Sequence, residues 1–245
     1  MNHSPIASRL GLAAVAVSTA LVVVALAIVP YLGSGWVAFE QGRAGAAELT
    51  EFAPGDLRTV TDAILADLVS GTGDFDVQLD GATVLSDTER SHMRDVRAVF
   101  ASLYAAAAVA LAILGIAFWR AGRQGSRWTR RDAWRGVRFG AIGLVIGTAV
   151  AGVIALVAFD VAFEVFHRLF FAQGTYLFDP ATSRLVQLFP DAFWSETAIA
   201  VGAMILVVAS GTAWLAGRRL RGHPVTVAAD VAAGEHRAAA HGTAR

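Results

Sequence analysis

The chain has 245 residues, of which 56% are hydrophobic and only 16% are charged, and its twenty basic and twenty acidic residues give a formal net charge of zero. Soluble domains average about 25% charged residues, so this composition argues against a soluble globular protein. The chain has no cysteine, which excludes disulfides, thiolate nucleophiles and cysteine-ligated metals.

Four long apolar runs account for the composition. Each has 21 to 23 residues with no acidic or basic side chain and no histidine, and about 20 residues span the hydrocarbon core of a bilayer as a helix. The sequence therefore predicts an all-α membrane protein whose residues 1–217 form a domain of four transmembrane helices. The spans are expected at about residues 10–32, 98–119, 139–159 and 197–217.

The charges between these runs predict an orientation. Residues 33–97 carry twelve acidic residues against five arginines, and residues 160–196 carry five against two. Residues 120–138 carry seven arginines against one aspartate, and residues 218–245 carry five against two acidic residues. The positive-inside rule then predicts a multi-pass protein of the cytoplasmic membrane with both termini in the cytoplasm. The basic segments favour contact with anionic lipid over nucleic acid, and the tail 218–245 is predicted to be disordered.

The first outer segment, residues 33–97, is predicted to fold as a small extracytoplasmic α+β cap. Apolar residues recur at helical spacing over residues 57–68, and Gly71 ends this helix. Apolar residues then alternate up to Asp80-Gly81, a dipeptide typical of a two-residue hairpin turn.

A helix-start signal precedes the second span. Residues 86–89 read Ser-Asp-Thr-Glu, which matches a capping box, and no proline follows before Trp119. The pattern predicts one continuous helix of about 33 residues that extends outward from the span. His92 lies on its protruding part, about 9 Å above the hydrocarbon edge at the usual rise per residue.

The third span is rich in glycine, and small residues let helices approach closely in lipid. The glycines are Gly140, Gly143, Gly147 and Gly152. If this helix continues outward beyond Phe159, four residues share one face, namely Asp160, Glu164, His167 and Phe171. His167 then lies about 12 Å beyond the apolar edge, at a height similar to that of His92. The two rings, on one side of a small bundle, are expected to meet.

The aromatic stretch 166–194 links the third span to the fourth in the outer loop 160–196. It contains eight aromatic residues and two prolines, a composition that indicates chain lying at a membrane surface. Gly174 and Asp179-Pro180 are expected to end the helix, and residues 185–189 form a short amphipathic or re-entrant piece.

His92 and His167 are the two histidines expected on the outer side, and three chemistries suit them. They could act as base and acid in acyl transfer. They could bind zinc with Glu164 or Asp160, although the spacing of a known zinc motif is absent. They could also sense pH, since an ordinary histidine titrates near neutrality.

Charged neighbours could support either histidine. Glu89 lies three residues before His92 and Asp95 three residues after it, so either could orient its ring along the helix. Glu89 is equally suited to capping the helix. Arg168 lies four residues from Glu164 and could pair with it or contact a phosphate.

Three strings carry a resemblance to a known family. They are Glu89-Arg90-Ser91-His92-Met93-Arg94-Asp95-Val96, Phe166-His167-Arg168-Leu169-Phe170-Phe171 and Leu188-Phe189-Pro190-Asp191-Ala192-Phe193-Trp194. Over about residues 10–217 the sequence resembles a family of four-helix integral membrane proteins that includes the bacterial lipoprotein intramolecular transacylases (Lit).

The resemblance implies an acyltransferase that acts on diacylglyceryl lipoproteins in the membrane. Such an enzyme moves the sn-2 acyl chain onto the amino group of the N-terminal cysteine and leaves a lyso-form lipoprotein. It implies that His92 and His167 are the active-site histidines, with no cofactor and no metal. Residues expected to bind or orient the substrate are Glu89, Asp95, Glu164, Arg168, Phe170, Phe171 and Trp194. The alternative is a non-enzymatic membrane scaffold or sensor whose cap binds a partner.

Overall fold

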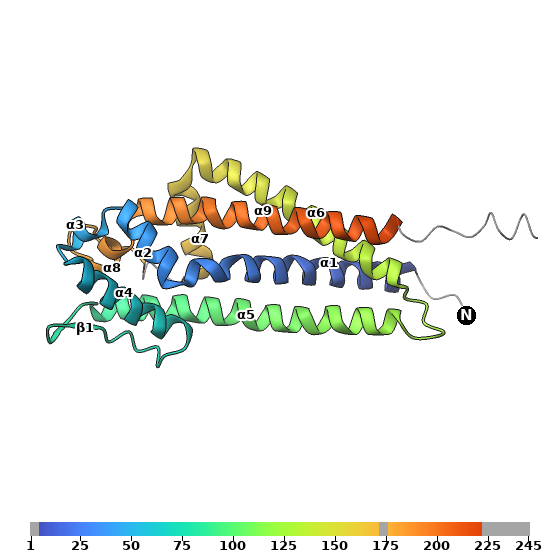
Figure 1. Cartoon of the computed structure of the whole chain (residues 1–245), viewed down its shortest axis with the longest axis horizontal. Coiled ribbons are helices and arrows are strands. Elements are labelled where there is room, and N and C mark those ends of the chain that lie inside the picture. The colour runs from blue at the N-terminus through green and yellow to red at the C-terminus, as the bar shows by residue number, and fades with distance from the viewer. Residues whose placement is uncertain (1–4, 172–175, 222–245) are drawn as a thin grey trace, which may run out of the picture.

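The computed structural model describes residues 5–171 and 176–221. Four helices in this part of the chain are long and apolar enough to cross a membrane, which confirms the predicted fold class. They are α1 (Pro5–Ile28), α5 (Asp87–Ala121), α6 (Arg130–Val157) and α9 (Asp191–Arg221). Helix α1 packs against each of the other three. Helices α1, α5 and α9 run along the long axis of the molecule, and α6 is inclined to them (Figure 1). The predicted disordered tail was wrong for residues 218–221, which form the last turn of α9. From residue 222 on the tail lies outside the described residues, as does the predicted helix break at Gly174.

Capping boxes set the starts of α5 and α6. At α5 the predicted box is confirmed, and the helix runs without interruption for 35 residues. Helix α6 begins at Arg130, earlier than the apolar run that predicted it, because Thr129 and Asp132 form a second box. The Thr129 hydroxyl donates to Asp132 Oδ2 at 2.6 Å and accepts from the Asp132 amide at 3.2 Å. The predicted inner loop therefore shrinks to the residues between α5 and Thr129.

A set of short elements gathers at one end of the bundle (Figure 1) and is called the cap below. It consists of α2 (Ser34–Arg43), α3 (Ala46–Thr50), α4 (Pro54–Val69), strands β1 (Gln78–Leu79) and β2 (Ala82–Thr83), and α8 (Arg184–Leu188). The predicted helix and hairpin are confirmed, with Leu79 opposite Ala82 in an antiparallel pair. Helices α2 and α3 are additions that the sequence pattern did not predict. The cap has one apolar core, to which α5 contributes Met93 and α8 contributes Leu185 and Leu188.

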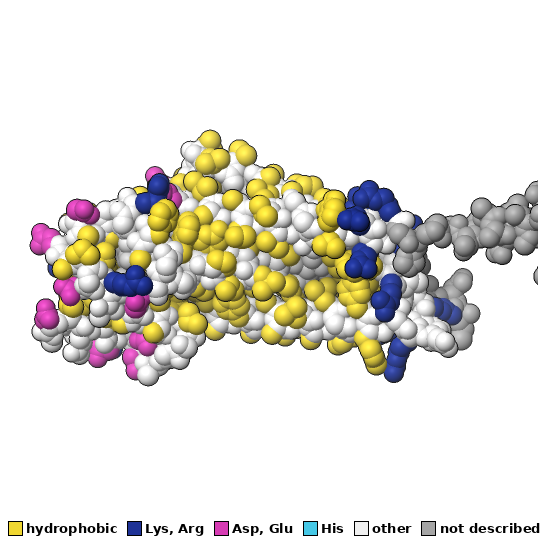
Figure 2. All heavy atoms as spheres, viewed as in Figure 1, with side chains coloured by type: hydrophobic (Ala, Val, Ile, Leu, Met, Phe, Trp, Pro, Cys, Tyr) yellow, Lys and Arg dark blue, Asp and Glu magenta, His cyan; other side chains and the backbone are white. Residues whose placement is uncertain are grey.

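The two ends of the molecule differ in charge. Figure 2 shows acidic side chains gathered over the cap, arginine side chains gathered at the opposite end, and a broad apolar surface between them. This distribution is what a protein crossing a bilayer along its long axis requires, because charged groups are costly in hydrocarbon. Which end faces the cytoplasm stays a prediction from the positive-inside rule.

The third helix does not continue outward as predicted. Helix α6 ends at Val157, and Ala158 leaves the helical conformation with φ −151° and ψ 53°. The chain then forms a separate helix, α7 (Phe159–Phe170), which turns back from the end of α6 (Figure 1). The expectation of a straight rod was wrong because neither glycine nor proline marks the turn at Ala158.

Close packing of α6 on α1 depends on particular glycines. A Cβ on Gly140 would lie 2.2 Å from the carbonyl oxygen of Ala16, so the two backbones touch there. The other three glycines of the third span have no such neighbour: a Cβ on Gly143, Gly147 or Gly152 would meet nothing within 4 Å. The predicted role in helix approach therefore holds for Gly140 and was wrong for the other three.

Replacing Gly140 by alanine is expected to destabilise the protein by about 2 to 3 kcal/mol, because the added methyl group overpacks a backbone contact. Thermal unfolding of the purified protein in detergent measures the effect. The matched control is Gly143→Ala on the same helix, which should leave the unfolding temperature unchanged or raise it, since alanine favours helix and meets open space. Equal unfolding temperatures for the two variants would contradict the packing described.

Candidate active site

Helix α5 presents His92 in its second turn, at the edge of the cap. The capping box at Ser86 and Glu89 fixes where the helix begins and hence which way this ring points. The His92 side chain is 6% exposed. Its Nδ1 atom is buried and has no hydrogen-bond partner among residues 5–171 and 176–221, so a polar atom of the ring is left free for chemistry.

Helix α7 presents His167, which is 8% exposed. The Nδ1 atom of His167 lies 2.8 Å from the carbonyl oxygen of Phe163, one helical turn earlier. A carbonyl oxygen only accepts hydrogen bonds, so Nδ1 carries the proton and donates it. In the neutral ring the lone pair is therefore on Nε2, which fixes the atom of His167 that can act as a base.

The two histidines meet although they come from different helices. Their ring centroids lie 6.1 Å apart, and the ring planes are inclined by only 19°. The predicted pairing is thus present, but it arises because α7 turns back toward α5 and not because two rods rise in parallel. Protonating both rings would place two like charges at this short separation, which favours at most one charged ring at a time.

Aromatic rings enclose the pair. Phe171 contacts both histidines, with ring centroids 4.8 Å from His92 and 5.3 Å from His167. Phe178 lies 5.6 Å from His92, and Tyr176 lies 5.0 Å from His167. Neither Phe178 nor Tyr176 was singled out in the sequence, because nothing in the local pattern shows that this part of the loop folds over the histidines.

Burial among these rings changes the acidity of His167. Loss of hydration disfavours the charged ring and lowers the pKa of His167 below its ordinary value of 6.5, while the hydrogen bond to Phe163 partly offsets this effect. His167 is therefore neutral at neutral pH, with its Nε2 lone pair available.

Acidification is expected to destabilise the fold through His167. Because the pKa of His167 is lower in the folded than in the unfolded protein, the unfolded chain binds this proton more readily, and stability is lost as the pH falls below about 6.5. The measurement is the unfolding temperature from about pH 7.5 to about pH 5, for the wild type and for His167→Gln. The variant should lose less stability over this range, and equal losses would contradict the assigned shift.

Glu89 joins α5 to the segment that precedes and includes α8, and it does not contact His92 through a hydrogen bond. Its Oε2 accepts from the Ser86 amide at 2.7 Å and the Ser86 hydroxyl at 2.8 Å. Its Oε1 accepts from the Ser183 hydroxyl at 2.5 Å and the Leu185 amide at 2.8 Å. Glu89 is 3% exposed, and both carboxylate oxygens hold α8 against the start of α5. Ser183, the N-cap of α8, was missed; a serine before a short apolar piece is its only signal.

The other charged candidates are exposed. Asp95 forms no hydrogen bond or ion pair with a described residue, but it is close enough to act electrostatically on His92. Glu164 and Arg168 form an exposed ion pair one turn apart on α7, and Arg168 also interacts with Tyr176 of the aromatic enclosure. Asp160 is also exposed, so of the four residues expected to share a face only His167 and Phe171 are buried.

The aromatic candidates divide into an inner and an outer set. Phe171 is 5% exposed and belongs to the enclosure of the histidines, whereas Phe170 is 48% exposed and packs on Phe166. Trp194 is 41% exposed and reaches the site through Phe163, with centroids 6.3 Å apart. The outer set therefore offers apolar surface beside the histidine pair.

A stripe of exposed aliphatic residues runs along α7. Val161, Val165 and Leu169 recur every four residues and are 61%, 59% and 75% exposed. Helix α7 therefore has a buried side with His167, a side with the Glu164–Arg168 pair, and an apolar side open to its surroundings. An amphipathic helix of this kind suits the boundary between hydrocarbon and headgroups.

The zinc alternative would need at least three ligating side chains to converge. Within the described ranges, 5–171 and 176–221, no group of three or more histidine, aspartate or glutamate side chains converges in a way that could hold a metal ion. Glu164 and Asp160, the carboxylates considered as partners, are exposed on α7. The site instead brings together two imidazole rings, His92 and His167, inside an enclosure of aromatic side chains.

Comparison with known proteins shows which solved structures share this fold. A search of the solved structures matches the membrane integral lipoprotein intramolecular transacylase Lit from Bacillus cereus with a TM-score of 0.70 at 19% identity, covering 90% of this chain and 100% of that one. Two variants of that protein, with a histidine replaced by arginine or by alanine, match with a TM-score of 0.64 at 19% and 20% identity, each covering 88% of this chain and 94% of the other. These likenesses show a common fold.

Sequence comparison gives the family directly. Among curated proteins no significant match is found. The family model for the lipoprotein intramolecular transacylase Lit matches residues 12–194, which is well over half of the sequence and includes both histidines of the pair. The chain therefore belongs to the lipoprotein intramolecular transacylase family, a family of membrane enzymes.

Proposed function

We propose that this protein is an O-to-N acyltransferase that acts on diacylglyceryl lipoproteins at the outer face of the cytoplasmic membrane. It moves the sn-2 acyl chain of the lipoprotein onto the α-amino group of the N-terminal cysteine, and the product is a lyso-form lipoprotein. Membership of the Lit family supports the general activity. The positive-inside distribution of arginine supports the side of the membrane.

The observation that carries the proposal is the buried pair of His92 and His167, with one imidazole held as a base. The hydrogen bond from Nδ1 of His167 to the Phe163 carbonyl leaves Nε2 as its basic atom. The lowered pKa of His167 keeps that atom unprotonated at neutral pH. Acyl transfer to an amine needs such a base, because an ammonium group has no lone pair with which to attack.

The reaction can be written with this pair alone. Nε2 of His167 takes the proton that the attacking amine loses, and the nitrogen bonds to the ester carbonyl carbon. The bond from that carbon to the glycerol oxygen then breaks, and the glycerol oxygen takes a proton and leaves as a hydroxyl. From the neutral amine to the amide, one proton moves from nitrogen to oxygen and none is consumed.

His92 is the partner in this scheme. It lies 6.1 Å from His167 between ring centroids, so an ester group placed between the rings can be reached from both sides. A ring N–H of His92 would donate a hydrogen bond to the oxyanion of the tetrahedral intermediate, and the proton that His167 took from the amine would pass to the leaving oxygen. Because amine and ester belong to one substrate molecule, holding them together supplies much of the rate.

The aromatic and aliphatic surfaces beside the pair would hold the acyl chains. Phe170 and Trp194 expose apolar surface next to the enclosure, and the aliphatic stripe of α7 faces the same apolar surroundings. Lipid chains enter such a site from the bilayer without crossing water, so the ester group can stay at the level of the histidines while its chains remain in hydrocarbon.

Mass spectrometry of lipoproteins tests the proposal. The protein is expressed in a bacterial strain that lacks other lipoprotein N-acylation, and N-terminal lipopeptides are analysed. We expect N-acyl, S-monoacyl peptides with the wild type and none with the double variant His92→Ala, His167→Ala at the same protein level. If the lipopeptides remain diacylated although the wild-type protein is well expressed, the proposal is wrong.

A further inference from the structure

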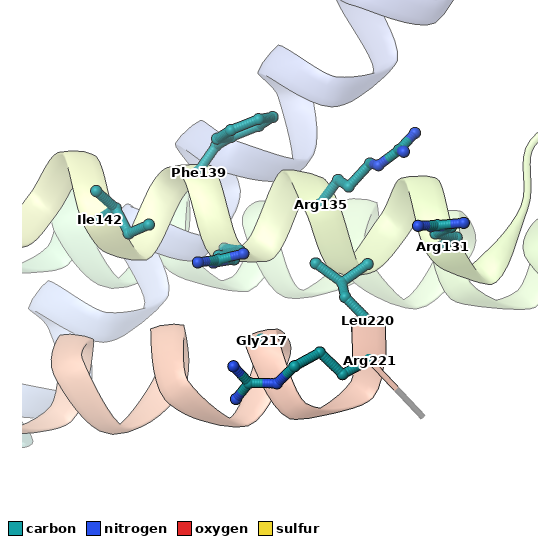
Figure 3. Close-up of a pocket in the computed structure, with 8 residues that line it drawn as sticks. Arg131, Arg135, Phe139, Ile142, Gly217, Leu220 and Arg221 are labelled. Carbon is teal, nitrogen blue, oxygen red and sulfur yellow. The ribbon is translucent and has the colours of Figure 1, made fainter. Parts of the chain in front are cut away.

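A groove lies between α6 and α9 at the end of the molecule opposite the histidine pair. Its volume is about 510 Å³. Four arginines and four uncharged residues line it: Arg131, Arg135, Arg138, Phe139, Ile142, Gly217, Leu220 and Arg221. Figure 3 shows α6 and α9 side by side, with Leu220 pointing from α9 toward α6.

Along α6 the lining of the groove changes from arginine side chains to apolar side chains. Arg131, Arg135 and Arg138 follow at i, i+4 and i+7, so they share one face of the helix, and Ile142 continues the same face one turn further into the bundle. On α9, Gly217 lines the groove next to Arg138, and an added Cβ would lie at an ordinary contact distance of 3.8 Å from Nε of Arg138. The groove therefore has a cationic mouth at the end of the molecule and an apolar wall toward its middle.

The cationic mouth is short of counter-charges. Arg131, Arg138 and Arg221 form no ion pair or side-chain hydrogen bond with any residue of the described ranges, and Arg135 approaches only Asp132, at 3.5 Å. Other arginines at this end are used differently. Arg123 stacks on Trp119 at 3.9 Å, and Arg218 stacks on Trp214 at 4.8 Å. The groove arginines thus keep donors free to bind a ligand.

We propose that this groove binds an anionic glycerophospholipid of the leaflet at the arginine-rich end. The lipid phosphate would bind Arg131 and Arg138, because a guanidinium offers a planar pair of donors to phosphate oxygens. The acyl chains would lie along Phe139 and Ile142, which are 61% and 37% exposed. A free phosphate would leave this apolar wall uncovered, which is why a lipid is favoured.

This site is separate from acyl transfer. None of its residues lies in the histidine enclosure, and it sits on the other end of α6 from α7 (Figure 1). It would anchor the packed pair α6 and α9 at a headgroup layer, as basic pockets between transmembrane helices do for anionic lipids. Its test can therefore fail while the proposed acyl transfer stands.

Native mass spectrometry of the full-length, delipidated protein in detergent measures the binding. The protein is titrated with dioleoyl phosphatidylglycerol, with dioleoyl phosphatidylcholine, and with inorganic phosphate. We expect the first bound phosphatidylglycerol to be favoured over phosphatidylcholine by about tenfold or more. Equal affinity of the two lipids would overturn the proposal, and so would displacement of phosphatidylglycerol by inorganic phosphate, which would indicate a simple anion site.

Matched variants assign the preference to the groove. The double variant Arg131→Gln, Arg138→Gln should reduce the preference for phosphatidylglycerol to less than about threefold. The control is Arg120→Gln, Arg127→Gln, which removes the same charge from exposed arginines at the same end that do not line the groove. The control should keep the wild-type preference for phosphatidylglycerol. An equal loss in both double variants would mean that the preference comes from general surface charge, and it would overturn the proposed lipid site.

Discussion

Replacing His167 by alanine is expected to slow acyl transfer by about 10²- to 10⁴-fold, the usual contribution of a positioned general base. The loss follows from the geometry, because Nε2 of His167 is held as the basic atom by the bond of Nδ1 to Phe163. The measurement is the initial rate at which purified protein converts a synthetic diacylglyceryl lipopeptide to its N-acyl form, followed by mass spectrometry. Unfolding temperatures confirm that the variant remains folded.

The matched control uses the other side of the same helix. Glu164→Gln breaks an exposed ion pair on α7, and exposed pairs of this kind contribute about 1 kcal/mol or less to stability. This variant should not change the rate by more than about twofold, since Glu164 is exposed and contacts none of the rings of the enclosure. A His167→Ala rate within a few-fold of the wild type, or an equal loss in the control, would mean that α7 does not carry the base.

Replacing Glu89 by alanine is expected to destabilise the protein by about 3 to 5 kcal/mol, because hydrogen bonds to a buried charged group each contribute about 1.5 to 3 kcal/mol. The change removes the acceptor of Ser183 and Leu185 and leaves a buried amide without a partner. The unfolding temperature should fall by roughly 10 °C. Activity should fall as well, since α8 is no longer tied to the helix that holds His92.

Asp87→Ala is the control for Glu89. Asp87 stands in the same first turn of α5, but its side chain is fully exposed and makes only a long contact of 3.7 Å with Arg90. Its removal should cost less than about 1 kcal/mol. If Glu89→Ala and Asp87→Ala lower the unfolding temperature equally, the hydrogen bonds of Glu89 to Ser183 and Leu185 do not add to the stability of the protein.

Much of the fold could be predicted because its signals are local. A run of about 20 apolar residues is enough to predict a transmembrane helix. The hairpin at Asp80-Gly81 and the helix start at Ser86 each depend on a few neighbouring residues, and both are confirmed. The capping box at Thr129 was equally local and could have been found, which would have placed the start of α6 correctly.

The features that could not be predicted depend on contacts distant in sequence. The bond from Ser183 to Glu89 joins residues 94 positions apart, and no local pattern shows that α8 packs against α5. The turn at Ala158 lacks glycine and proline, so it follows from packing and not from backbone preference. The pairing of His92 and His167 was predicted from their similar heights above the apolar runs and from the sequence motifs shared with the family. The straight helix on which the height of His167 was based was wrong.

The proton position on His167 is the detail of greatest functional weight that the sequence could not provide. Spacing alone makes either histidine a possible base. The structure fixes the neutral tautomer of His167 and leaves that of His92 open, because the Nδ1 atom of His167 meets a carbonyl oxygen at 2.8 Å while Nδ1 of His92 meets no partner among the described residues. Such a distinction needs three-dimensional geometry, since the Phe163 carbonyl belongs to the backbone and is present whatever the residue type.

A label-crossover measurement tests the central claim most directly. Purified protein receives two diacylglyceryl lipopeptides together, one with an isotopically heavy peptide and a heavy sn-2 chain, and one unlabelled. Intramolecular transfer at the His92–His167 pair predicts N-acyl products in which peptide and amide-linked chain always carry the same label. Products of mixed label, or substrates recovered without an N-acyl chain, would contradict it.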